Sequence, residues 1–159
     1  MKKSAGLTLV EMLIVVGLLA ILLGLGTIVF SGFARKDQIE STAKKIVAVL
    51  SEAQAKTLAG YSQGQESSLN FGIHFQTDAY ILFSGTSFDP QDQTNQKYVL
   101  PSRLEISTIF FPSGNAIFEK ITGQVRDFNP GQNLIILTDQ AGSQEKRISI
   151  NKLGVVKIE

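Results

Sequence analysis

A long apolar run near the N-terminus constrains this chain more than any other feature. The run extends from Met12 to Phe30, and Lys2 and Lys3 precede it. About 19 residues at a helical rise of ~1.5 Å span nearly 30 Å, which is the thickness of the hydrocarbon core of a bilayer. A membrane-spanning helix is therefore predicted over residues 7–33. Because flanking positive charges stay in the cytoplasm, the C-terminal part of this single-pass chain is expected outside the cytoplasmic membrane.

Two simpler interpretations of the run are an uncleaved signal anchor and an ordinary secretory signal peptide. A secretory signal needs a shorter apolar core followed by a cleavage site between small residues. Here the helical pattern continues past Arg35. A signal anchor remains the stronger of the two alternatives.

Glu11 separates these interpretations, because an ionised carboxylate at the end of an apolar helix is costly unless it is paired or lies near the interface. Cleavage after Gly6 would create a new α-amino group at Leu7, four residues before Glu11. That amine can pair with the carboxylate within one chain or between neighbouring helices, where a low dielectric strengthens the attraction. A simple anchor has no such use for an acidic residue.

The segment from Gly6 to Leu13 resembles the class III signal of type IV pilins and type II secretion pseudopilins. In that signal a short basic leader ends in glycine and the fifth mature residue is glutamate, as in Gly6 and Glu11 here. The resemblance implies that residues 1–6 are a leader removed by a prepilin peptidase and that Leu7 becomes the methylated N-terminus. It also implies that Glu11 aligns an incoming subunit with one already in the filament. Leu7 replaces the phenylalanine usual at this position.

Residues 34–59 have the pattern of an amphipathic helix that covers a sheet. The helix is predicted to extend from near Leu7 through this segment, and Gly60 is its stop signal. Glu40 and Lys44 are spaced for an ion pair between successive turns. The apolar positions at helical spacing are Ile39, Ala43, Ile46, Val47, Leu50, Ala53 and Leu58.

From Ser68 onward the hydrophobic period changes to two, which predicts β-strands. Segments 71–75 and 80–83 flank a turn and are expected to form a hairpin. The polar, turn-rich residues 84–96 predict a surface loop. Further strands are predicted at residues 104–111, 116–122, 134–138, 146–150 and 155–158.

One long helix followed by about six or seven antiparallel strands predicts an α+β fold, in which the helix packs on an antiparallel β-sheet head. The head is expected to comprise residues 34–159, with its β-rich part at 68–159. Residues 110–114 (FFPSG), 147–150 (RISI) and 154–156 (GVV) resemble the head of the minor pseudopilins that include the secretion-system H subunit and FimT-like pilins. That resemblance implies a minor rather than a major subunit.

Composition and motifs argue against nucleic-acid binding and catalysis. The net charge of +1, from 15 basic and 14 acidic residues, offers no basic surface for a phosphate backbone. The chain has no cysteine, and its sole histidine, His74, lies in a predicted strand where it is expected to face solvent or a loop. No enzyme and no cofactor are therefore predicted. Asp89 and Asp92 are weak candidates for a calcium site, although their spacing is not that of an EF-hand and a solvated loop is favoured.

The sequence predicts a structural subunit, a minor pilin or pseudopilin, of a type IV pilus, competence pilus or type II secretion filament. The expected partners are the prepilin peptidase, other pilin or pseudopilin subunits, the inner-membrane assembly platform and, before assembly, the lipid bilayer. The expected location is the cytoplasmic (inner) membrane and then the filament. The alternative is a signal-anchored extracytoplasmic binding domain that never polymerises.

Overall fold

The computed structural model describes residues 8–60 and 69–159, and within its helix the side chains of residues 25–35 are not described. The chain divides into two compact units, Met1–Asp37 and Gln38–Glu159. A helix of 50 residues, α1 (Leu9–Leu58), contributes to both. This helix agrees with the one predicted from its sequence pattern.

The described part of the first unit exposes its apolar side chains around the helix. Residues 8–24 are all exposed, and the large hydrophobic side chains from Leu9 to Leu23 are between 46% and 80% exposed. A helix that is apolar on every side requires a protein or lipid partner. The predicted apolar run continues to Phe30, which lies outside the described side chains. Among the described residues, no helix is both long and apolar enough to cross a membrane.

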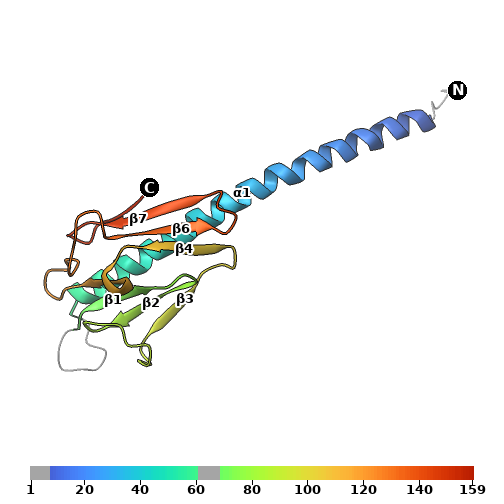
Figure 1. The fold of residues 1–159 in the computed structure, drawn as a ribbon. Coiled ribbons are helices and arrows are strands. Elements are labelled where there is room, and N and C mark those ends of the chain that lie inside the picture. Colours follow the sequence, from blue (N-terminus) through green and yellow to red (C-terminus); the bar gives the residue numbers. More distant parts are fainter. Residues whose placement is uncertain (1–7, 61–68) are drawn as a thin grey trace. The chain divides into compact units, whose positions relative to one another are not determined.

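The second unit contains two four-stranded antiparallel sheets, and the C-terminal half of α1 packs against both of them (Figure 1). All neighbouring strands are antiparallel. The first sheet has the order β3 (Gln96–Val99), β2 (Ala79–Ser84), β1 (Phe71–Phe75), β5 (Asn115–Phe118). The second has the order β4 (Leu104–Ile109), β6 (Leu134–Asp139), β7 (Glu145–Ile150), β8 (Val156–Ile158), and a short 3-10 turn, η1 (Pro112–Gly114), precedes β5.

The α+β prediction is confirmed, but the strands divide into two sheets rather than one. The hairpin of β1 and β2 is confirmed, whereas β3 was not predicted. This edge strand is exposed at Gln96, Lys97 and Val99, so it lacks the hydrophobic alternation that marks a half-buried strand. Its one inward contact is Tyr98, whose ring stacks on that of Tyr80 with centroids 5.1 Å apart.

One face of α1 forms the centre of the core, together with side chains from both sheets. The predicted positions Ile39 through Ala53 are buried or half-buried, but the prediction was wrong at Leu58, which is 53% exposed. Leu58 is the last helical residue, and Thr57 takes the inward position beside it. The buried helix side chains are Ile39, Thr42, Ala43, Ile46, Val49, Leu50, Ala53 and Thr57.

Polar anchors fix the end of α1 in the head. The Thr57 hydroxyl donates to the Ala53 carbonyl at 2.8 Å and accepts from the Phe71 backbone N–H at 3.0 Å, which ties the helix to β1. The Gln54 side-chain amide donates to the carbonyls of Gly123 at 2.9 Å and Leu153 at 2.8 Å. These contacts hold two loops against the helix and give both backbone carbonyls a partner within the protein.

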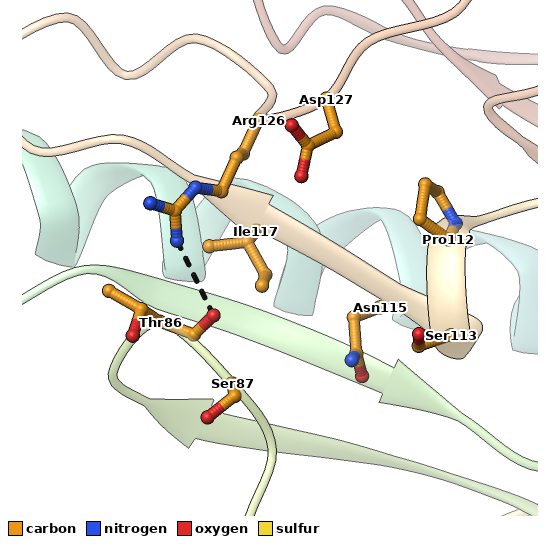
Figure 2. A pocket seen from close by; sticks show the side chains of 8 residues that line it. All are labelled: Thr86, Ser87, Pro112, Ser113, Asn115, Ile117, Arg126 and Asp127. Atoms are coloured by element: carbon orange, nitrogen blue, oxygen red, sulfur yellow. Dashed lines mark hydrogen bonds between the residues drawn. The ribbon is translucent and has the colours of Figure 1, made fainter.

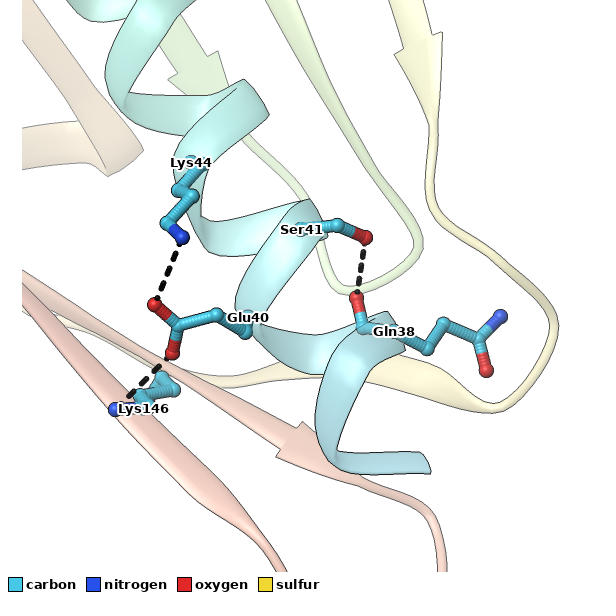
Figure 3. Close-up of polar contacts among 5 residues, drawn as sticks. All are labelled: Gln38, Glu40, Ser41, Lys44 and Lys146. Carbon is cyan, nitrogen blue, oxygen red and sulfur yellow. Dashed lines mark hydrogen bonds and ion pairs between the residues drawn. The ribbon is translucent and has the colours of Figure 1, made fainter. Parts of the chain in front are cut away.

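Glu40 links the start of the packed helix to the second sheet (Figure 3). Its carboxylate lies 3.3 Å from the ammonium nitrogen of Lys44 and 3.4 Å from that of Lys146, which lies on β7. A hydrogen bond from Lys44, which has the larger effect, and one from Lys146 hold the pKa of Glu40 below its usual range. The predicted pair of Glu40 and Lys44 is thus confirmed and extended across to a strand.

The loop at residues 85–95 covers the outer face of the first sheet. Phe88 stacks on His74 of β1 with ring centroids 4.1 Å apart and meets Phe83 of β2 edge-on at 5.6 Å. Phe83 is 1% exposed although it points away from the helix. The predicted surface loop therefore contributes one inward aromatic anchor, and His74 faces this loop.

Gly72→Ala is expected to destabilise the head by about 1–3 kcal/mol, because overpacking forces neighbours to move. A Cβ at Gly72 would lie 2.8 Å from the ring of Phe83 and 2.9 Å from the carbonyl oxygen of Ala116. Chemical denaturation of the full chain in detergent, followed by circular dichroism, measures the effect. Gly17→Ala is the matched control, since a Cβ there meets nothing within 4 Å. Equal stability of the two variants would contradict tight packing on this face.

Candidate processing and assembly site

The first turn of α1 is closed by a reciprocal pair of contacts between Thr8 and Glu11. The Thr8 hydroxyl oxygen lies 3.3 Å from the Glu11 backbone N–H, which donates to it. The Glu11 carboxylate lies 3.4 Å from the Thr8 backbone nitrogen and 3.3 Å from its hydroxyl. This is the capping box that Ser or Thr forms with a Glu three residues later. The Glu11 carboxylate is thereby turned back toward the start of the helix.

The electrostatics of this turn favour an acidic side chain. The first N–H groups of a helix have no partner within it, and their partial positive charge stabilises a nearby carboxylate. The Thr8–Glu11 distances are long for hydrogen bonds, so these contacts are weak. A cationic group that approached Glu11 would therefore displace little of the existing bonding.

The structure places only part of the predicted site. Gly6 and Leu7 lie outside the described residues, so the cleavage bond and the methylated amine stay predictions. Glu11 lies in the first turn of α1. Thr8 is the contributor that the sequence interpretation missed, although the spacing Thr-x-x-Glu was a usable signal for it.

Comparison with known families decides the identity of this segment. Residues 1–27 match the family model described as the prokaryotic N-terminal methylation motif. The start of the chain carries the N-terminal signal of type IV pilin-like proteins. The class III signal predicted around Gly6 and Glu11 is thus confirmed, and processing by a prepilin peptidase follows from the motif. No curated protein and no solved structure matches this pilin-like chain.

The weak calcium candidates Asp89 and Asp92 accept hydrogen bonds from neighbouring residues of their own loop. The Asp89 carboxylate accepts from the Gln91 backbone N–H at 2.9 Å. The Asp92 carboxylate accepts from the backbone N–H and the hydroxyl of Thr94, both at 2.8 Å, and these bonds lower the pKa of Asp92. Over residues 8–60 and 69–159, no group of three or more His, Cys, Asp or Glu side chains is arranged to hold a metal ion. The sequence favoured a solvated loop here, and calcium binding by the weak candidates Asp89 and Asp92 is not tested by these contacts.

Proposed function

We propose that this pilin-like protein is a structural subunit, a minor pilin or pseudopilin, of a type IV pilus, competence pilus or type II secretion filament. The observation that carries the proposal is the N-terminal methylation motif at residues 1–27, which includes the exposed apolar part of α1 from Leu9 to Leu23. The protein acts by non-covalent assembly and is a substrate of the prepilin peptidase rather than an enzyme.

The exposed apolar side chains supply the driving force for assembly. Lipid covers them before assembly and equivalent helices cover them afterwards, because exposure of their hydrophobic surface to water is unfavourable. Cleavage after Gly6 frees the amine of Leu7 near the Glu11 carboxylate. The pairing of that amine with Glu11 of the same or a neighbouring subunit then sets the register between helices. The inner-membrane assembly platform is the expected site of this step.

The assignment to a minor subunit is supported by the head. Its turn at Pro112–Gly114 and its closing strands β7 and β8 lie where the sequence resembles the secretion-system H subunit and FimT-like pilins. The competing proposal, a signal-anchored binding domain that never polymerises, leaves Glu11 and the methylation motif without a role.

Intact-mass measurement and N-terminal sequencing test the proposal. The protein is coexpressed with and without a prepilin peptidase, alongside a known prepilin as a control. The expected product is a mature chain that starts at Leu7 and carries one added methyl group. A chain that still starts at Met1 while the control prepilin is cleaved would overturn the proposal in favour of a permanent anchor.

A further inference from the structure

A cavity with both polar and apolar lining opens on the head beside β5, far along the chain from the methylation motif (Figure 2). Its volume is about 210 Å³. Three segments surround it: the beginning of the loop that covers the first sheet, the turn at Pro112–Gly114, and residues 126–127. Together with Asn115 and Ile117 of β5, these separate segments make the cavity a product of the fold rather than of one loop.

The wall of the cavity combines hydrogen-bonding groups with a comparable amount of apolar surface. Thr86, Ser87 and Ser113 supply hydroxyl groups, each able to donate and accept. Ile117 supplies an apolar face; it is 8% exposed and lies between the polar side chains in Figure 2. Such a mixture suits a ligand that has both hydroxyl groups and a C–H face.

Two side chains of opposite charge, Arg126 and Asp127, line the cavity. The Arg126 guanidinium donates to the carbonyl of Thr86 at 3.4 Å, and the Asp127 carboxylate points into the same space (Figure 2). The ion pairs found among the described residues involve other side chains. The cavity therefore offers charged donors and acceptors together with no net charge, which disfavours a strongly charged ligand such as phosphate.

Backbone strain is concentrated at the same place. Among the described residues, Ser113, Ile121 and Asp127 are the non-glycine residues with positive φ, at 52°, 75° and 51°. Two of these three, Ser113 and Asp127, line the cavity. Strained backbone conformations persist where the surrounding structure fixes them, and they gather at ligand sites.

His74 supports one residue of the lining, Asn115. The imidazole Nδ1 of His74 lies 2.8 Å from the side-chain oxygen of Asn115, which lines the cavity. Phe88 stacks on the same imidazole. When Nδ1 carries the proton, His74 donates to Asn115 and leaves the two N–H groups of its amide for other partners. His74 is thus a positioning residue for Asn115.

We propose that this cavity binds one neutral pyranose ring, such as the terminal sugar of a glycan. A cavity of ~150 Å³ accepts benzene, so the observed volume suits a six-membered ring with small substituents. Arg126 donates to sugar oxygens, Asp127 accepts from a sugar hydroxyl, and the C–H face of the ring lies against Ile117. This activity belongs to the head alone and does not depend on assembly into a filament.

Amide NMR titration of the full chain tests the proposal. The protein is held in micelles of lauryldimethylamine oxide, because detergents with sugar headgroups would compete. The probes are methyl α-D-glucopyranoside, methyl β-D-galactopyranoside and N-acetyl-D-glucosamine, with inorganic phosphate and glycine as charged comparisons. At least one sugar is expected to give saturable, millimolar shifts centred on Ser113, Asn115, Arg126 and Asp127. Absence of such shifts with all three sugars, or shifts there with phosphate or glycine alone, would overturn the proposal.

Asp127→Asn is the decisive variant. Loss of a charge-assisted hydrogen bond is expected to weaken sugar binding by about 10-fold. Asn tolerates the positive φ of this position as well as Asp does, so the fold is preserved. Asp89→Asn is the matched control, because Asp89 is an exposed aspartate that does not line the cavity. Unchanged sugar affinity in Asp127→Asn, or equal weakening in Asp89→Asn, would contradict a site at this cavity.

Discussion

Glu11→Ala is expected to abolish efficient incorporation into filaments, while cleavage after Gly6 continues. Assembly would bury the Leu7 amine among apolar helices, where a charge without a partner is costly. Removal of one member of a buried ion pair costs about 3–5 kcal/mol, equivalent to a loss of more than ~100-fold in the assembly equilibrium. Immunoblots of the sheared filament fraction and of the membrane fraction measure assembly and maturation separately.

Two further variants separate the charge of Glu11 from its capping role. Gln is also accepted at the third helical position of a capping box, so Glu11→Gln keeps the cap and removes the charge. Thr8→Val removes the hydroxyl that accepts from the Glu11 N–H and keeps the charge. The proposed role predicts that Glu11→Gln fails to assemble and that Thr8→Val still assembles. The opposite pattern would assign Glu11 to helix capping alone.

The elements with strong periodicity were predictable from the sequence. The helix followed from its apolar run and its amphipathic second half, and the hairpin of β1 and β2 followed from alternation around Gln76–Asp78. Each of these patterns depends on neighbours within a few residues. Local spacing was therefore enough to specify them.

The division into two sheets depended on information that local spacing does not contain. β5 pairs with β1 rather than with β4 or β6, and its strand ends at Phe118 instead of continuing to Thr122. Ile121, with a φ of 75°, belongs to the turn that ends this pairing. A β-branched residue is unfavourable at positive φ and common in strands, so the sequence pattern predicted that the strand would continue through Ile121. Tertiary contacts determined the outcome.

The candidate sites differ in the same way. Gly6 and Glu11 belong to one short motif, and the motif identified them. The cavity brings Ser87, Ser113 and Asp127 together from separate segments of the head. None of these residues has a distinctive sequence context, so only the fold could associate them.

Gly6→Val is expected to leave the chain unprocessed at its N-terminus and absent from filaments. The amount of mature protein is expected to fall at least ~10-fold, which corresponds to about 1.4 kcal/mol of lost transition-state binding. Glycine allows close approach of the backbone to another group, and a branched side chain beside the scissile bond would occupy that space. Intact mass of the coexpressed protein distinguishes the precursor from the mature chain.

Ser4→Val is the matched control for Gly6→Val, because it places the same side chain within the leader and away from the bond to be cut. Processing is expected to persist in Ser4→Val. A signal anchor would be indifferent to both changes, and equal maturation of the two variants would therefore favour the anchor. Glu11→Ala and Gly6→Val thus stop the pathway at different steps. The former accumulates a mature chain that does not polymerise, whereas the latter accumulates a precursor whose Glu11 never meets a free amine.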